Sequence, residues 1–325
     1  MDKILVLSGD GIGPAVISSA EEVLKAACGS LEIIHGQIGR SAYEDTGSYL
    51  PHDTLDLLDE SKVILSGPVY VPENGKDPLQ LLKVQLDLFS RGRYYKTLAG
   101  DLGVTDMEVT LWSSYNNIAS EITEVKDFDG VTISKYIRSN AYSRMMSSAM
   151  TDIEMRGLKK ICCLSRGDFF PISSGMFIEA FDTLFETAGY ETRSMNVKDW
   201  MSTIFKDPLH DDCIICVDLY NQLVAGALSG LCGNENLFPT VYSGSDYALY
   251  EPNFTPEIEG SEPNYENPTS AIYAASVILS HMGMNSESKR IIDALCSCYE
   301  AGERTPDVDG SLTCQEFTEK VIDRI

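Results

Sequence analysis

The hydrophobic positions of this chain fall into short apolar runs that alternate with longer stretches of helical spacing. Residues 4–7 read Ile-Leu-Val-Leu, a run typical of a buried strand, and helical periodicity follows at 14–27. Strands that alternate with helices in this way predict an α/β fold. The same pattern predicts further strands at 31–34, 62–65, 108–112, 131–137, 160–164, 192–197 and 213–217, and further helices at 53–59, 140–155, 175–188, 200–206, 221–231, 268–281, 287–299 and after 313.

Composition narrows the class of protein. The chain has 325 residues, of which 43% are hydrophobic, so it can form one large domain or two of ordinary size. Its 49 acidic and 25 basic residues give a formal net charge of -24. Such a surface repels phosphate groups, which argues against binding to nucleic acids or anionic membranes. A small anionic substrate would therefore need a local cluster of Lys and Arg.

The start of the sequence and its cysteines predict a cytoplasmic location. No basic segment followed by a cleavable apolar segment opens the sequence, and no apolar stretch reaches the ~18 residues that span a membrane. Cys162, Cys163, Cys213 and Cys216 fall within predicted strands, which predicts buried free thiols. Cys213 and Cys216 cannot share a metal, because residues three apart in a strand point to opposite faces.

Four segments, in this order, resemble signature segments of one enzyme family. Residues 9–14 read Gly-Asp-Gly-Ile-Gly-Pro, and residues 63–69 read Val-Ile-Leu-Ser-Gly-Pro-Val after a predicted helix. Residues 267–272 read Asn-Pro-Thr-Ser-Ala-Ile, and Thr-Pro-Asp opens a turn at 305 before the last helix. Together they resemble the β-decarboxylating dehydrogenases, the isocitrate and 3-isopropylmalate dehydrogenases. The resemblance implies two α/β domains that share a central mixed sheet.

The resemblance also implies a domain plan and a quaternary structure. Residues 1–88 and 233–325 would form the first, cofactor-side domain, and residues 89–232 the second domain, on the side of the substrate and the dimer contact. A strand-like arm at about 118–137 resembles the clasp by which family members form dimers with shared active sites. We therefore expect a homodimer, with a hetero-oligomer formed with an active relative as the alternative.

In the family this sequence resembles, a 2-hydroxy acid is oxidised by hydride transfer to NAD or NADP and then decarboxylated, with a divalent metal held by three aspartates. Two of those aspartates, four residues apart on one helix, correspond to Gln222 and Gly226, and the third corresponds to Lys198. Because a hard cation prefers carboxylate oxygens and Lys198 adds a positive charge, we expect no tight Mg²⁺ or Mn²⁺ site. Asp199 or Asp218 would serve only if the alignment shifts by a residue or two.

The acid–base residues are also altered. The family's catalytic lysine corresponds to Arg166, which cannot act as a base near neutral pH. The family's tyrosine falls near Ala119 or Ser120, and Tyr115 lies close by but out of register, so a packing role is expected for it. An electrostatic role for Arg166 or Lys198 in place of the metal is the remaining catalytic hypothesis.

Three arginines usually hold the substrate carboxylates in this family. The first corresponds to Lys83, the second is kept as Arg93, and the third falls at Ser113 or Trp112. Lys83 and Arg93 are therefore predicted to bind substrate. Arg91 adds a third cation to this segment, and both a solvated turn and an anion site are consistent with such a cluster.

The predicted cofactor residues are Gly11, Ile12, Gly13, Glu257 and Asn267. The glycines permit a tight turn and close backbone approach. Glu257 stands where NAD-specific members bind the ribose hydroxyls with an aspartate, and its carboxylate would repel the 2′-phosphate of NADP. The family's His-Gly pair is missing from this loop, so we expect NAD rather than NADP, bound weakly.

Three hypotheses about function follow. The chain is a NAD-type oxidoreductase scaffold whose metal-dependent oxidative decarboxylation is lost or altered, and which acts on a different small acid. Alternatively it is a non-catalytic regulatory or ligand-binding relative, or an active NAD-dependent dehydrogenase of the isopropylmalate or isocitrate type. Substitution at every metal position favours the first two.

Overall fold

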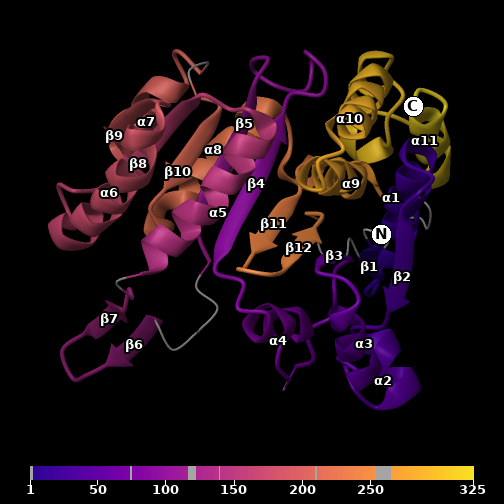
Figure 1. Ribbon diagram of the computed structural model, residues 1–325, viewed down its shortest axis with the longest axis horizontal. Coiled ribbons are helices and arrows are strands. Elements are labelled where there is room, and N and C mark those ends of the chain that lie inside the picture. Colours follow the sequence, from indigo (N-terminus) through magenta and orange to yellow (C-terminus); the bar gives the residue numbers. More distant parts are fainter. Residues whose placement is uncertain (1–2, 74, 116–121, 139, 209–210, 254–264) are drawn as a thin grey trace.

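The computed structural model describes residues 3–73, 75–115, 122–138, 140–208, 211–253 and 265–325. Within them one ten-stranded mixed sheet runs in the order β2-β1-β3-β12-β11-β4-β5-β10-β8-β9, and β6 pairs with β7 in a separate ribbon (Figure 1). This confirms the predicted α/β fold with a central mixed sheet. Among the described residues, no helix is both long and apolar enough to cross a membrane.

Both ends of the chain build one half of the sheet. Its strands β2, β1, β3 and β12 are parallel, and β11 is antiparallel to β12. Helices α1, α9, α10 and α11 pack together beside this half (Figure 1). The elements are β1 (Lys3–Leu7), α1 (Gly13–Ala27), β2 (Glu32–Gly36), α2 (Arg40–Thr46), α3 (His52–Asp56), β3 (Val63–Ser66), α4 (Pro78–Gln85), β11 (Thr240–Ser243), β12 (Ala248–Glu251), α9 (Thr269–His281), α10 (Asn285–Glu300) and α11 (Cys314–Ile322).

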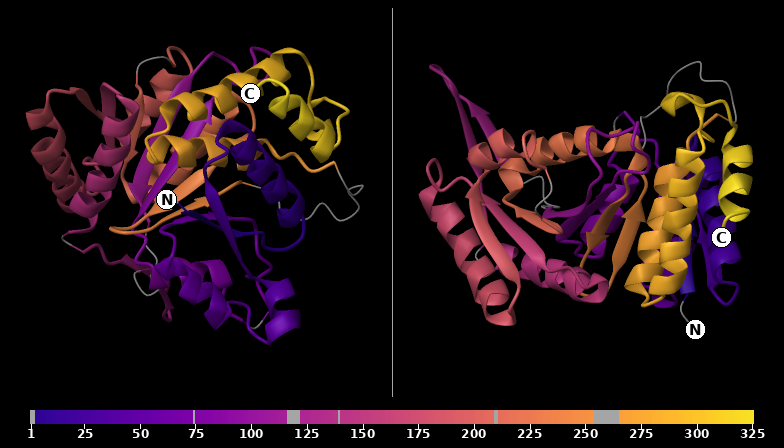
Figure 2. Two further views of the ribbon diagram at one scale, coloured as in Figure 1. Left: turned by 45° about the vertical axis from the view of Figure 1, so that its right-hand side comes forward. Right: turned by 90° about the horizontal axis from the view of Figure 1, so that it is seen from above.

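The other half of the sheet comes from the middle of the chain. Here β4 is antiparallel to β5, and β5, β10, β8 and β9 are parallel. The β6–β7 arm stands away from the sheet (Figure 2). The elements are β4 (Ser90–Lys96), β5 (Glu108–Ser114), β6 (Ile122–Lys126), β7 (Val131–Lys135), α5 (Ala141–Arg156), β8 (Lys160–Ser165), α6 (Pro171–Phe185), β9 (Glu191–Asn196), α7 (Val197–Ile204), β10 (Cys213–Cys216) and α8 (Asn221–Cys232).

The structure corrects the predicted elements in two ways. Five elements had no counterpart in the prediction, namely α2, α4, β4, β11 and β12. β4 carries charged side chains, and β11 and β12 have four residues each, so none of them shows a clear apolar period. Helix α7 begins at Val197 rather than at 200, because the Asn196 side chain accepts a hydrogen bond from the backbone N–H of Lys198 and caps it. The predicted domain boundary would separate β11 from β4, and it stays a prediction.

Strands β4 and β5 lie at the middle of the sheet and present different chemistry on their two faces. The antiparallel register pairs Arg91 with Ser113 on one face and Gly92 with Trp112 on the other. A Cβ on Gly92 would lie 2.7 Å from the Trp112 ring, so only glycine leaves room for the indole. We call the face that carries Arg91 the cleft face and the opposite one the back face.

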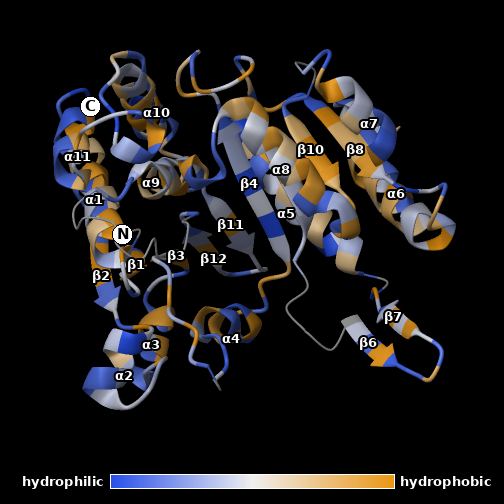
Figure 3. Ribbon diagram, turned by 180° about the vertical axis from the view of Figure 1, so that it is seen from behind, coloured by the Kyte–Doolittle hydropathy of each residue, from blue (hydrophilic) through white to orange (hydrophobic). Residues whose placement is uncertain are grey.

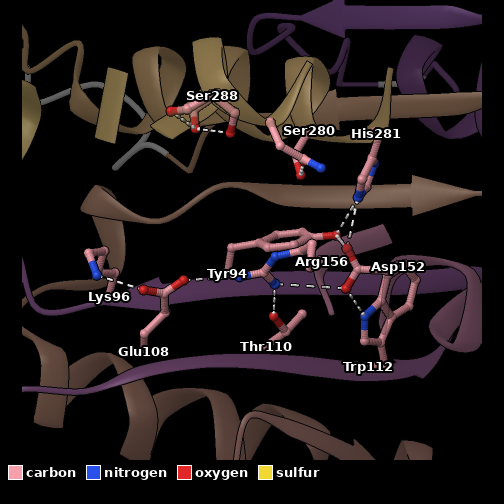
Figure 4. A network of polar contacts seen from close by, with 12 residues as sticks. Tyr94, Lys96, Glu108, Thr110, Trp112, Asp152, Arg156, Ser280, His281 and Ser288 are labelled. Atoms are coloured by element: carbon pink, nitrogen blue, oxygen red, sulfur yellow. Dashed lines mark hydrogen bonds and ion pairs between the residues drawn. The ribbon is translucent and has the colours of Figure 1, made fainter. Parts of the chain in front are cut away.

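A buried polar network fills the back face between α5 and α9 (Figure 4). Oδ1 of Asp152 lies 2.9 Å from Nε2 of His281 and accepts a hydrogen bond of 3.1 Å from the Tyr94 hydroxyl. Its Oδ2 accepts a hydrogen bond of 3.1 Å from Trp112 Nε1 and lies 3.8 Å from Nη1 of Arg156. Because His281 belongs to α9 and Asp152 to α5, the network joins the two halves of the molecule.

Candidate functional site

The cleft face gathers polar side chains from four strands. One row across the sheet runs Ser113, Arg91, Tyr242, and the next runs Leu111, Arg93, Thr240, Glu251. Because strand residues two apart share a face, the two rows lie side by side. The register also decides between the two positions expected for the third arginine: Ser113 is on the cleft face, whereas Trp112 faces Asp152.

Two arginines of β4 meet the start of helix α8. Nη2 of Arg93 donates to Oε1 of Gln222 at 2.8 Å, and its Nη1 donates to Oδ1 of Asn221 at 3.4 Å. Nη2 of Arg91 donates to the same Asn221 oxygen at 2.5 Å. Burial lowers the pKa of Arg93, and the neighbouring charge of Arg91 lowers it further. The amide side chains of Asn221 and Gln222, at the start of α8, therefore hold both guanidinium groups.

Lys83, predicted to bind substrate, already has an anionic partner within the protein. Its Nζ lies 2.7 Å from Oε1 of Glu251 and 3.8 Å from the centre of the Tyr242 ring, and its side chain is buried. Burial acts to lower the pKa of Lys83, but the carboxylate of Glu251 outweighs it and the pKa is raised. Lys83 is thus a charged, paired residue of the cleft.

Tyr115 packs against a neighbouring ring, in line with the packing role expected for it, and it also lies close to two cations. Its hydroxyl donates to Oε1 of Gln80, and its ring stacks edge-on against Tyr242 with centroids 4.6 Å apart. Lys83 and Arg91 lie 5.7 and 5.9 Å from the centre of the ring. Burial raises the pKa of Tyr115 to about 12, so the phenol stays protonated near neutral pH. Sequence spacing could not reveal this, because the contact depends on how β11 pairs in the sheet.

The residues at the family's metal positions on α8 are not carboxylates. Gln222 is engaged by Arg93, and Gly226, four residues on, has no side chain. Asp218, the alternative ligand, is ion-paired with Lys135 of the arm. Over the described ranges, no three His, Cys, Asp or Glu side chains gather as a metal site would require.

Arg166 and Lys198 belong to a second polar group, at the ends of β8 and β9. Nε of Arg166 donates to Oδ1 of Asp168 at 2.9 Å, and that oxygen accepts a 2.8 Å bond from Asn196. Oδ1 of Asn196 accepts from the backbone N–H of the exposed Lys198. The hydrogen bond with Asp168 raises the pKa of Arg166, which keeps it charged and unable to act as a base.

The described cofactor residues lie at the starts of two helices that pack together, α1 and α9. Gly11 has a φ of 59° and a Cβ there would meet no atom within 4 Å, so there is open space beside the turn. Ile12 caps α1, and a Cβ on Gly13 would lie 2.2 Å from the Ser8 carbonyl oxygen. Asn267 accepts from the backbone N–H of Thr269 and so helps to start α9.

One predicted cofactor residue, Glu257, lies outside the described residues. Gly11 is exposed with open space beside it, whereas Gly13 is buried against the Ser8 carbonyl, and contact between this turn and a nucleotide stays a prediction. Asn267 is engaged by its own helix and by Asp307, whose Oδ2 accepts from it at 3.1 Å. A direct contact between Asn267 and a nucleotide stays a prediction.

Comparison with known proteins places this geometry in context. The sequence profile described as isocitrate/isopropylmalate dehydrogenase matches residues 3–321. The chain is 26% identical over 323 residues to the 3-isopropylmalate dehydrogenase of Methanothermobacter thermautotrophicus, covering 98% of this chain and 97% of the relative. It is 26% identical over 342 residues to the catalytic subunit 6 of the mitochondrial NAD isocitrate dehydrogenase of Arabidopsis thaliana, covering 99% and 88%.

A solved structure shows the same fold. The apo β-decarboxylating dehydrogenase of Thermococcus kodakarensis superimposes with a TM-score of 0.87 at 19% identity, covering 100% of this chain and 96% of that one. These matches contradict the expectation of weakly bound NAD and no tight Mg²⁺ or Mn²⁺ site. The chain aligns from end to end with dehydrogenases, one of them named for NAD. The expectation was wrong because it rested on the identities of a few side chains, whereas the match to these dehydrogenases runs along the whole chain.

Proposed function

We propose that this chain, which belongs to the isocitrate/isopropylmalate dehydrogenase family, is a NAD-type oxidoreductase for a small 2-hydroxy acid whose oxidative decarboxylation is lost or altered. The observation that carries the proposal is that Gln222 and Gly226 of α8 stand at the positions of two family aspartates. Gln222 and Asn221 bind the guanidinium of Arg93, so these positions orient a cation of the substrate site.

The chain's own residues support binding and orientation of an acid. NAD, when bound, supplies the acceptor for the hydride from C2, and the hydroxyl proton leaves separately, which gives a 2-keto acid. Arg91 and Arg93 offer N–H groups to a carboxylate. Tyr115, with a pKa raised to about 12 by burial, offers a hydroxyl near the two cations that flank its ring. Arg166 cannot take the hydroxyl proton, so proton removal differs from that by a lysine.

A gain-of-function variant tests the proposal. Lys198→Asp, Gln222→Asp and Gly226→Asp are combined, and a Cβ at position 226 meets no atom within 4 Å, so the last change has room. NADH formation and CO₂ release are measured with 3-isopropylmalate, isocitrate and homoisocitrate, with and without Mn²⁺. We expect the triple variant to release CO₂ at least about tenfold faster than the wild type with Mn²⁺ present. A wild type that is equally fast would identify an active dehydrogenase of the usual type.

The regulatory alternative is favoured by a different observation. Two cations are already bound by carboxylates of the same chain, Lys83 of α4 by Glu251 and Lys135 of the arm by Asp218. A protein that only binds its ligand would show a calorimetric signal with these acids and no NADH formation under any condition. Mixing with an active relative, followed by gel filtration and assay, would then reveal a hetero-oligomer with altered kinetics.

The proposed assembly of this enzyme is a homodimer in a reducing, cytoplasmic setting. The arm from β6 to β7 exposes Val125, Phe128, Val131 and Ile133, and the β6 side of it is coloured as hydrophobic in Figure 3. Apolar side chains that stand clear of the sheet support contact with a second copy. All nine cysteines are free thiols, which supports the reducing location. A monomeric mass by light scattering at micromolar concentration would refute the dimer.

A further inference from the structure

The pairing of β4 with β5 offers a substitute for the third arginine. Arg91 lies directly opposite Ser113 in the antiparallel register. Side chains opposite each other on one face have Cβ atoms about 5 Å apart, so a long side chain at either position reaches the same space. Ser113 is buried and short, which leaves that space to Arg91.

The guanidinium of Arg91 has unused hydrogen-bonding capacity. Its Nη2 donates to Asn221 at 2.5 Å, but its Nε is buried and meets no acceptor within the described part of the chain. A buried N–H without a partner costs free energy, and a carboxylate would satisfy it with a charge-assisted bond. Buried N–H groups without an acceptor are uncommon in folded proteins, so this one points to a ligand.

Arg93 lies two residues away on the same face, and its guanidinium converges on the same atom. Oδ1 of Asn221 accepts from Nη2 of Arg91 and from Nη1 of Arg93. The two positive charges oppose each other, in agreement with the lowered pKa of Arg93, which burial and Arg91 together produce. An anion between the two guanidinium groups would offset both effects.

Lys83 stands apart from this pair. Its ammonium is held by Glu251 at 2.7 Å and lies on the ring of Tyr242, the residue opposite Arg91 on β11. Tyr242 therefore lies beside Arg91 in the sheet and against Lys83, which comes from helix α4. A second carboxylate of the substrate would have to displace Glu251 from Lys83, which leaves one strong carboxylate subsite in the described cleft.

From this geometry we propose that Arg91 is a substrate-binding residue that replaces the guanidinium missing at Ser113, and that Arg91 and Arg93 together bind one carboxylate of a 2-hydroxy dicarboxylate. This inference rests on the proposed function and names its substrate class. Glu251 already neutralises Lys83, so the additional carboxylate of a tricarboxylate would form no ion pair with this lysine. We therefore expect dicarboxylates to bind more tightly than tricarboxylates.

A cross-strand exchange tests the inference. Dissociation constants for 3-isopropylmalate and isocitrate are measured by titration calorimetry, with NAD present, on the wild type, on Arg91→Ser, on Arg91→Lys and on the double variant Arg91→Ser/Ser113→Arg. Lys160→Ser, a change of the exposed end of β8, is the control of equal charge. Circular dichroism and melting temperature confirm that each variant is folded.

We expect Arg91→Ser to weaken binding of the dicarboxylate about 10- to 100-fold and Lys160→Ser to leave it unchanged. Arg91→Lys should bind between these limits, because an ammonium cannot reproduce the guanidinium fork. The double variant should recover binding to within about threefold of the wild type, since the guanidinium returns from the opposite strand.

Three results would overturn the inference. Arg91→Ser could bind as tightly as Lys160→Ser, the double variant could fold and bind no better than Arg91→Ser, or isocitrate could bind more tightly than the dicarboxylate. Any of these results would contradict either the role of Arg91 in substrate binding or the preference for dicarboxylates. The proposed oxidoreductase function would not be affected. A wild type that binds neither acid would instead refute the proposed function and this inference with it.

Discussion

Asp152 is the residue whose loss should most weaken the junction between the two halves of the molecule. Its side chain is only 2% exposed and bonds to Trp112, Tyr94 and His281. We predict that Asp152→Leu is strongly destabilising, because it removes the acceptor shared by all three. Asp152→Asn keeps the shape and should be mild.

The size of each effect follows from the bonds that are lost. In Asp152→Leu the Trp112 N–H becomes a buried donor without a partner, which costs about 1–3 kcal/mol, and losing the carboxylate beside His281 adds about 1.5–3 kcal/mol. Arg156 keeps its 3.2 Å contact with Glu108, so no unpaired cation is left. The two costs add to about 2.5–6 kcal/mol, which includes the range of about 3–5 kcal/mol for breaking a buried pair.

Asp152→Asn should cost only about 1–2 kcal/mol. Its amide oxygen can accept from Trp112, and its NH₂ group can donate to the Tyr94 oxygen, so most of the network is kept. Asp56→Asn is a matched control, because that carboxylate is 78% exposed.

The dependence on pH has a defined sign. Burial favours the neutral acid, but the hydrogen bond from His281 and the charge of Arg156 outweigh it and lower the pKa of Asp152 below its ordinary 3.8. A lowered pKa in the folded state means that the carboxylate contributes fully above about pH 4, and that the contribution is lost as the pH falls through the folded pKa. The gap between wild type and Asp152→Leu should therefore be present above about pH 4 and shrink as the pH falls below it.

The measurement is urea denaturation followed by far-ultraviolet circular dichroism at 25 °C and several pH values. A cost below about 1 kcal/mol for Asp152→Leu would show that the network does not stabilise the junction. If Asp152→Asn lowers the free energy of unfolding as much as Asp152→Leu does, the amide does not replace the hydrogen bonds of the carboxylate. A gap that does not shrink below about pH 4 would assign the effect to another group.

Three further predictions concern the cleft and the arm. Gly92→Ala should destabilise by about 1–3 kcal/mol in the same assay, because its Cβ would press on the Trp112 ring at 2.7 Å. Lys83→Met and Glu251→Met should each cost about 3–5 kcal/mol while the double variant costs far less, since a single change removes the oppositely charged neighbour of a buried charge, and a double-mutant cycle measures the difference. Ile133→Glu should convert the expected dimer to a monomer in light scattering, because it places charge in the exposed apolar arm.

Each of these has a result that contradicts it. A neutral Gly92→Ala would mean that the indole moves aside freely. If the losses of unfolding free energy in Lys83→Met and Glu251→Met add up in the double variant, the two charges do not interact. A dimeric Ile133→Glu at micromolar concentration would place the contact elsewhere than on the arm.

The sequence by itself determined the class of fold and the ancestry of the chain. Buried strands such as β1 and β10 must be apolar on both faces, so they stand out as runs between helical stretches. The turn at Gly11 and the segment that starts at Asn267 depend on local geometry, which short motifs specify. These features need no knowledge of distant residues, and the family match along residues 3–321 agrees with them.

Only the tertiary structure decided which side chains meet in the cleft. β4, β11 and β12 carry Arg91, Tyr242 and Glu251 on their cleft face, which hid their strand character from any apolar pattern. The contacts of Lys83 with Glu251 and of Arg91 with Asn221 join residues far apart in the chain. Such pairs depend on strand register, and a shift of one residue would turn every side chain to the other face, which is why the local sequence could not supply them.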